Sequence, residues 1–402
     1  MWQSINTISL SRDLMNGEAS QAFALSVKAL ASLATCQAGH AVRCSDKNAL
    51  LVCGRRRSQR YWYDEPHRDR SAKAVVSRKK YRFKRKLAYS RTSESGNSII
   101  DQIDLRGYLH PEYAASLSEW GKPRELTVAG GWVLERTIPD TSRRDATGCY
   151  PLMACRNWSR LEDDFAHFAD EWVSFVAVPD PLGAPGEAEL RKLFADHVRP
   201  FKAHYTIELA TWSEAAKPVH RARVRQGDER VTVEVRPAIP ADIDQWDVIY
   251  AELIARKQLS GLHTFSRAAF ETLLQVPGVY ISRAAAKGET VCMSIWVTHA
   301  DCVYSHLTAS TAIGYELSAA YPMIDRAIRY FQSRSFALID LGGGAGLDDD
   351  ATDGLASFKR GWSNSVRQAY ICGRIFDHAA YRSLTGERTT DYFPAYRSGE
   401  FN

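Results

Sequence analysis

The chain has 402 residues, of which 45% are hydrophobic and 25% are charged, and its formal net charge is +5. This composition is typical of globular proteins and excludes collagen-like, low-complexity and disulfide-rich miniprotein classes. The length predicts two or three domains of ordinary size.

The positive charge is concentrated in one segment near the N-terminus. Residues 54–91 contain fifteen Lys and Arg against three acidic residues, a surplus of twelve, so the rest of the chain carries a net charge of −7. We therefore expect a mildly acidic body joined to a strongly basic segment.

This basic segment belongs to a first region, residues 1–98, which shows no apolar periodicity apart from one possible helix over 19–34. Such a sequence predicts a basic, poorly ordered extension, or residues that lie upstream of the protein's true translation start. The alternative is an arm that contacts nucleic acid, since Arg60-Tyr61-Trp62-Tyr63 combines phosphate-binding and base-stacking side chains.

Membrane and metal signals are weak. No run approaches the roughly 18 to 20 apolar residues that a membrane span needs, and the Ala-rich stretch 22–41 lacks the basic start of a signal peptide. We therefore expect a cytoplasmic protein. The eight cysteines form no Cys-x-x-Cys pair and are expected to be reduced. No metal site is expected, because the cysteines and histidines nearest the N-terminus fit no common zinc spacing: Cys36, His40, Cys44, Cys53 and His67.

Residues 99–218 alternate between strand and helix patterns and predict an α/β unit. Segments rich in β-branched and aromatic residues indicate strands at 131–139, 172–179 and 204–210. Helices are expected at 159–170, where Ser159 and Glu162 have the spacing of a capping box, and at 187–198.

Residues 219–402 give the clearest pattern. We expect helices at 241–259, 267–275, 315–332 and 354–362, and strands at 230–236, 279–286, 290–299, 302–310, 336–341 and 367–372. The strands between 279 and 310 are separated by loops short enough only for hairpins, so they are antiparallel. The helix after residue 310 crosses over the sheet, so the strands at 302–310 and 336–341 are parallel. A cleft is expected where these two diverge.

Two motifs follow in this third region. The first is Asp340-Leu341-Gly342-Gly343-Gly344, and the second is Gly354-Leu355-Ala356-Ser357-Phe358-Lys359. Together with the order of the expected helices and strands, these two motifs resemble the C-terminal half of FemAB-like proteins of the GNAT acyltransferase superfamily. The resemblance covers roughly residues 99–385 and implies a mixed α/β fold of two tandem GNAT-like domains, 99–218 and 219–402, behind the basic extension.

The glycines after Asp340 let the backbone bend and approach a ligand, although a plain tight turn is the alternative. Adjacent helical residues point in different directions, so Phe358 can pack while Lys359 faces the cleft; a solvated lysine is the alternative. In the FemAB-like proteins that the chain resembles, the matching Phe-Lys pair lies beside the reacting groups. This implies Lys359 and Asp340 as catalytic residues, with Phe358, Gly342, Gly343 and Gly344 around the substrate.

The turn before the helix at 315 is a second candidate binding site, because a helix N-terminus offers free amides to an anion. Its expected contacts are Ser310, Thr311, Gly314 and Tyr315. Acetyl-CoA-dependent GNAT enzymes hold pyrophosphate here with an Arg/Gln-x-x-Gly-x-Gly/Ala loop. The corresponding loop of this chain has one glycine, and it does not begin with Arg or Gln. FemAB-like proteins also differ from the acetyl-CoA pattern in this way.

Three further groups of residues are candidates for the site. Tyr304 and His306 alternate on one face of a strand, so His306 could remove a proton from an attacking amine, or could be a hydrogen-bonded strand histidine beside a packing Tyr304. His220, Arg221 and Arg223 resemble the basic segment that links the two domains in FemAB-like proteins. We expect them to bind substrate, because clustered arginines bind phosphate or carboxylate groups well, and a solvated linker is the alternative. The segment 148–155 could line the inter-domain cleft, but its cysteines lack a paired base, so a thiol nucleophile is not expected.

These features predict an acyltransferase that joins an activated acyl group to an amine. The donor, acyl-CoA or aminoacyl-tRNA, would be a co-substrate, with no permanently bound cofactor. The acceptor would be a small molecule or a cell-wall precursor, and tRNA is a candidate partner. The alternative is a non-catalytic GNAT-like module that binds nucleic acid or protein.

Overall fold

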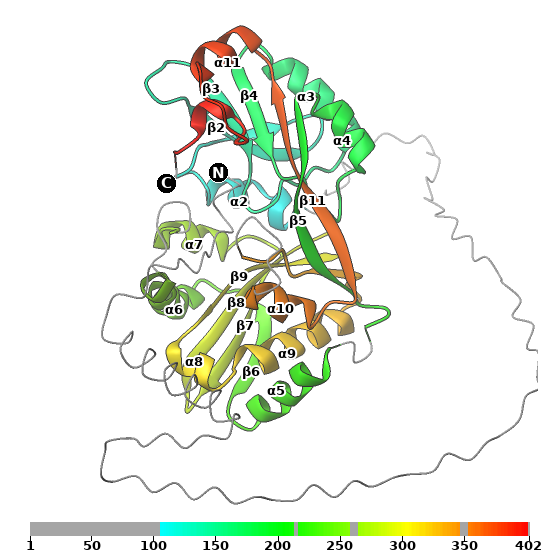
Figure 1. Ribbon diagram of the computed structural model, residues 1–402. Helices are drawn as coiled ribbons and strands as arrows, with labels where there is room; N and C mark the ends of the chain where they lie inside the picture. The colour runs from blue at the N-terminus through cyan, green and yellow to red at the C-terminus, as the bar shows by residue number, and fades with distance from the viewer. Residues whose placement is uncertain (1–104, 213–215, 258–263, 346–352, 401–402) are drawn as a thin grey trace, which may run out of the picture. The chain divides into compact units, whose positions relative to one another are not determined.

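The computed structural model describes residues 105–212, 216–257, 264–345 and 353–400. The basic extension expected over 1–98 lies outside these ranges. The described residues form one mixed sheet of eleven strands in the order β1-β2-β3-β4-β11-β5-β10-β9-β8-β7-β6 (Figure 1). No helix in the described ranges combines the length and the apolar character needed to cross a membrane.

The first part of the sheet is built from residues before β5. Its strands are β1 (Lys122–Leu126), β2 (Gly131–Thr137), β3 (Arg144–Gly148) and β4 (Trp172–Ala177), accompanied by η2 (Gly107–Leu109), α2 (Pro111–Ala115), η3 (Trp158–Arg160), α3 (Leu161–Phe168) and α4 (Glu187–Leu193). The predictions of β2 and β4 are confirmed. The capping box is wrong: Ser159 lies in η3 and bonds Asn157, and no side chain caps α3.

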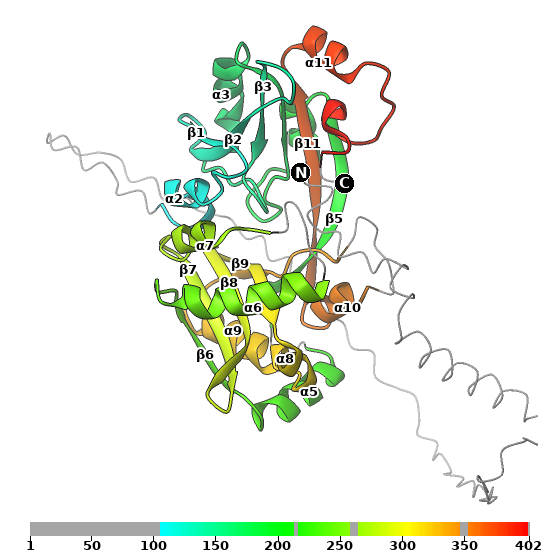
Figure 2. The same cartoon turned by 90° about the vertical axis from the view of Figure 1, so that its left-hand side faces the viewer.

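The second part carries the hairpins. Its strands are β6 (Thr232–Pro237), β7 (Val279–Ala286), β8 (Glu289–His299), β9 (Cys302–Ser310) and β10 (Leu338–Asp340), and its helices are α5 (Pro218–Asp228), α6 (Asp242–Lys257), α7 (Arg267–Leu273), α8 (Ala312–Glu316), α9 (Ala320–Ser333) and α10 (Gly354–Arg360). Figure 2 shows α6 crossing in front of β7, β8 and β9, with α9 behind them. The antiparallel pairing of β7, β8 and β9 is confirmed.

Three expected elements differ from the structure. The helix predicted over 315–332 is interrupted, because Ser318 adopts a φ of 56° between α8 and α9. The segment at 219–225 is not a linker but part of α5. The helix predicted over 187–198 ends at Leu193, and the long strand β5 (His197–Glu208) begins four residues later.

The two parts are joined through β5 and β11 (Ser365–Ile375), which pair antiparallel over nine residues of register. β11 also pairs with β4, and β5 also pairs with β10. The chain ends with α11 (His378–Thr385) and η5 (Ala395–Arg397). The sheet therefore continues without interruption across the boundary proposed at residue 218.

The parallel pairing of β9 with β10 is confirmed, with Cys302, Val303 and Tyr304 opposite Leu338, Ile339 and Asp340. The pairing stops there. β9 has a bulge at His306, because Leu307 and Ser305 pair with consecutive residues of β8. The chain after Asp340 continues beside β5, where Tyr205 N donates to Gly342 O and Leu341 N donates to Tyr205 O. The two strands thus diverge after Tyr304 and Asp340.

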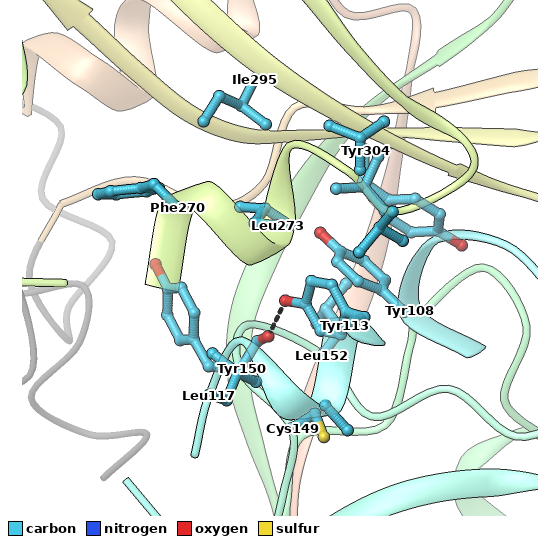
Figure 3. Packing of buried hydrophobic residues seen from close by; sticks show 14 of the residues in the cluster. Tyr108, Tyr113, Leu117, Cys149, Tyr150, Leu152, Phe270, Leu273, Ile295 and Tyr304 are labelled. Carbon is cyan, nitrogen blue, oxygen red and sulfur yellow. Dashed lines mark hydrogen bonds between the residues drawn. The ribbon is translucent and has the colours of Figure 1, made fainter. Parts of the chain in front are cut away.

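Both faces of the sheet are packed. On one face α9 contributes Phe331 to a cluster with Trp296 and Val303. On the other face, aromatic residues before β1 and the loop after β3 join α7 and β8. Figure 3 shows Tyr108 beside Tyr304, and Tyr113 joined to Tyr150 by a hydrogen bond. The cluster on this second face draws residues from both parts of the sheet, whereas the first part also has a separate cluster around Phe165 and Trp172.

Candidate active site

The candidate site begins at the glycine loop that follows β10. Asp340 accepts a hydrogen bond from the Gly342 amide at 2.7 Å, and Gly342 has a φ of 76°, which favours glycine. A Cβ on Gly343 would lie 2.9 Å from Cδ of Lys202, so this position also needs glycine. The loop is therefore held in one conformation with its carbonyl groups available as acceptors.

Two lysines bind those carbonyl groups. Lys359 Nζ donates to Gly343 O at 2.6 Å, and Lys202 Nζ, from β5, donates to Gly344 O at 3.2 Å. Burial lowers the pKa of Lys359 to about 8, although the nearby carboxylates of Asp340 and Asp353 act in the opposite direction. Lys359 is thus mostly protonated at neutral pH, in a place where its charge is weakly screened.

Helix α10 sets the direction of Lys359. The Asp353 side chain caps the helix by accepting from Leu355 N at 2.8 Å, and it also accepts from Ala345 N at 2.5 Å. Phe358 packs on the other side, with its ring centroid 5.0 Å from that of Tyr321. The structure thus places Phe358 in aromatic packing and Lys359 on the glycine loop, and the catalytic role of Lys359 stays a prediction.

Asp340 has a partner that the sequence analysis missed. His204, on β5, places Nδ1 2.7 Å from Asp340 Oδ2, and both side chains are buried. No motif marked His204, since the contact spans 136 residues and depends on the antiparallel pairing of β5 with β10. Only the alternation of β5 could have placed it on the same face as Lys202.

Tyr304 and His306 both lie on the face of the shared core, as predicted, but neither faces an open cleft. Tyr304 donates to Asp180 at 2.7 Å. His306 is surrounded by the rings of Tyr108, Tyr113 and Tyr150, and Tyr108 OH lies 3.3 Å from its Nδ1. Burial lowers the pKa of His306 to about 3, so the ring is neutral and a weak base. Its catalytic role stays a prediction, one that this environment does not favour.

The amides at the start of α8 already have a protein partner. Ala312 N donates to Glu252 Oε1 at 2.6 Å, and Gly314 N donates to the Thr311 hydroxyl at 3.0 Å. Ser310 Oγ donates to the sulfur of Cys292 at 2.9 Å, and Tyr315 stacks on the Arg256 guanidinium. A Cβ on Gly314 would collide with Val291 O, so this glycine permits close packing on β8. Ser310 is six residues beyond Tyr304, which pairs with Asp340, so it lies roughly 20 Å along the strand from the level of Asp340.

The basic segment on α5 divides into one buried and two outer residues. His220 is buried, and its Nε2 lies 2.9 Å from the Phe358 carbonyl oxygen, which ties α5 to α10. Arg221 donates to Ala216 O at 2.5 Å, and the exposed Arg223 donates to Ser318 Oγ at 3.3 Å.

Thiol and metal chemistry have little support in the described ranges. Burial raises the pKa of Cys149 to about 12 and also raises that of Cys155. These thiols are protonated at neutral pH and are poor nucleophiles. No group of three His, Cys, Asp or Glu side chains within the described ranges is arranged to hold a metal ion. The cysteines and histidines considered for zinc lie outside those ranges.

Comparisons with known proteins identify the fold. No protein-family model and no curated protein matches the sequence. Among solved structures, the crystal structure of FemX is similar with a TM-score of 0.54 and 11% identity, over 68% of this chain and 93% of that one. The C-terminal domain (DUF2156) of a putative lysylphosphatidylglycerol synthetase from Agrobacterium fabrum is similar with a TM-score of 0.51 and 13% identity, over 68% and 89%. The described part of the chain therefore has the α/β fold seen in FemX and in that synthetase domain.

Proposed function

We propose that the protein is an acyltransferase that forms an amide between an activated acyl donor and an amine acceptor. The observation that carries this proposal is the position of Lys359. Its ammonium group is held on the Gly343 carbonyl, beside Asp340, where β9 and β10 diverge. Ligands of open α/β sheets bind at such points.

A fixed cation suits acyl transfer because negative charge develops on the acyl oxygen during attack. The amine nitrogen forms a bond to the acyl carbon, and the carbonyl oxygen becomes an oxyanion. A preorganised, weakly screened ammonium group stabilises that charge more than water does. The C–O or C–S bond to the leaving group then breaks, and the amine proton ends on the leaving oxygen or sulfur.

An aminoacyl ester of tRNA fits the proposal better than acyl-CoA. Glu252 takes the Ala312 amide at the position where acetyl-CoA-dependent GNAT enzymes bind pyrophosphate, and its carboxylate would repel an anion there. The acceptor would be an amine on a cell-wall precursor or on a small molecule, and no permanently bound cofactor is required.

The test is transfer of a labelled acyl group by the full chain. Aminoacyl-tRNAs and acyl-CoAs are supplied in turn with a panel of amines, and we expect amide product from an aminoacyl ester. Lys359→Met should abolish turnover, whereas the matched variant Lys192→Met, at an exposed lysine of α4, should keep it. Turnover of neither donor would overturn the proposal. RNA binding without turnover would instead favour a non-catalytic binding module.

A further inference from the structure

Asp340 makes two hydrogen bonds that together fix the proton on its histidine partner. Oδ1 accepts from the Gly342 amide and Oδ2 faces His204 Nδ1, each at 2.7 Å. A carboxylate only accepts, so Nδ1 of His204 carries a proton, and in the neutral form of the ring the lone pair is on Nε2. Within the part of the chain that the structure describes, Nε2 of His204 has no hydrogen-bond partner.

This histidine and Lys359 act on the same glycine loop. Asp340, which holds the His204 ring, also holds the amide of Gly342, and Lys359 holds the carbonyl of the next residue. The Asp340 carboxylate is close enough to Lys359 to raise its pKa against the effect of burial. The possible base, His204, and the cation, Lys359, are thus both held through adjacent residues of the glycine loop, at the point where β9 and β10 diverge.

Other histidines near the sheet fit the role of base less well. His306 has a tyrosine hydroxyl as its hydrogen-bond partner and no carboxylate in contact, so a charge on its ring would be uncompensated. His220 directs Nε2 at a backbone carbonyl, which requires a proton there. His299 faces Asp180 and Tyr304 with Nε2, and its Nδ1 is buried without a partner.

We infer that His204 is the general base of the proposed acyl transfer and that Asp340 is its positioning residue; the inference rests on that proposed function. As the C–N bond forms, Nε2 of His204 takes a proton from the amine nitrogen. Asp340 stabilises the resulting imidazolium ion. Nε2 then returns the proton to the leaving oxygen as the C–O bond to the donor breaks.

The first test removes the base and keeps its contact with Asp340. In His204→Asn, the amide N–H can still donate to Asp340, but no group remains that can take a proton. We expect kcat to fall about 10²- to 10⁴-fold, with little change in KM, and added imidazole to restore part of the turnover in His204→Ala. The matched control is His197→Asn on the same strand, where the ring stacks on Phe393 instead. It should keep wild-type turnover.

The second test reads the tautomer of His204 without any turnover, from ring ¹⁵N shifts assigned with the His204→Asn variant. The wild type should carry its proton on Nδ1. In Asp340→Asn, Oδ1 stays on the Gly342 amide, so the amide nitrogen faces His204 and moves the ring proton to Nε2. That variant should lose turnover with His204 intact.

The outcomes separate the two proposals. An active wild type whose His204 carries its proton on Nε2, or an active His204→Asn variant, overturns the base role alone. A wild type that turns over no donor overturns the proposed function and the base role with it.

Discussion

Glu252 on α6 accepts a hydrogen bond from the backbone amide of Ala312 at 2.6 Å, where the chain enters α8. The same carboxylate lies 3.3 Å from Arg256, whose guanidinium donates to Ser310 O at 2.8 Å and stacks on Tyr315. The turn is therefore closed by side chains of α6. The resemblance to GNAT enzymes implies this turn as the place where an acetyl-CoA donor would put its pyrophosphate.

This contact predicts that coenzyme A does not stabilise the protein. A ligand raises the unfolding midpoint only if it binds the folded state. Here Glu252 already accepts from the Ala312 amide, and Arg256 is already paired with Glu252 and bonded to Ser310 O. Thermal unfolding with and without millimolar coenzyme A checks this, with an acetyl-CoA-dependent GNAT enzyme as the positive control. A rise of several degrees that grows with concentration would contradict it.

Much of the second part of the sheet could be predicted from sequence because it depends on local rules. The bounds of β7 and β9 are those predicted, since two short loops force hairpins. The parallel pairing of β9 with β10 follows from the helix between them. These features need only the pattern of residues close together in the chain.

The missed features depend on contacts between distant residues or on polar sequences. His204 meets Asp340, 136 residues away, through the pairing of β5 with β10, and Glu252 meets Ala312 across 60 residues. β1 and β3 were missed because Lys-Pro-Arg-Glu-Leu and Arg-Asp-Ala-Thr-Gly have little of the β-branched and aromatic character that marks a strand. The sequence motif predicted Lys359 and the glycine loop, but no motif predicted their partners on β5, Lys202 and His204.

Lys359 should make stability depend on pH in a defined direction. Its pKa is lowered from 10.5 to about 8 by burial, whereas the unfolded chain keeps the ordinary value. Between these values the unfolded state binds more protons, so the free energy of unfolding rises with pH over this window. Urea unfolding of the wild type and Lys359→Met from pH 7 to 10.5 checks this. The wild type should gain stability relative to the variant above about pH 8, and a constant difference would show that Lys359 keeps its ordinary pKa.

Gly343 and Gly354 offer a matched pair of glycine substitutions. In Gly343→Ala the new Cβ would lie 2.9 Å from Lys202 Cδ and 3.1 Å from its Cβ, so the loop or the lysine must move. Turnover should fall, because Lys359 also depends on this peptide. In Gly354→Ala, at the start of α10, the new Cβ would meet nothing within 4 Å. That variant should keep turnover and gain up to about 1 kcal/mol of stability. Equal effects of the two substitutions on turnover would contradict the role of the loop.

The C-terminal segment should be fixed mainly by one buried ion pair. Arg397 donates to Asp145 on β3 at 2.6 and 2.9 Å, and both side chains are at most 2% exposed. The same guanidinium donates to Thr137 O at 2.9 Å and to Glu400 at 2.6 Å, so it joins the end of the chain to β2 and β3.

Removing one partner of such a pair leaves a buried charge without its counterpart. We expect Arg397→Met to cost about 3 kcal/mol, the lower end of the usual range, because Arg136 at 3.5 Å and the Tyr396 hydroxyl at 3.0 Å still contact Asp145. Glu400→Gln, which changes the more exposed partner, should cost at most about 1 kcal/mol. Urea unfolding at neutral pH measures both values. If the two variants lose the same stability, the buried pair with Asp145 contributes no more than the outer contact, and the segment must be fixed by its apolar packing, in which Tyr396 lies 5.3 Å from Tyr381 between ring centroids.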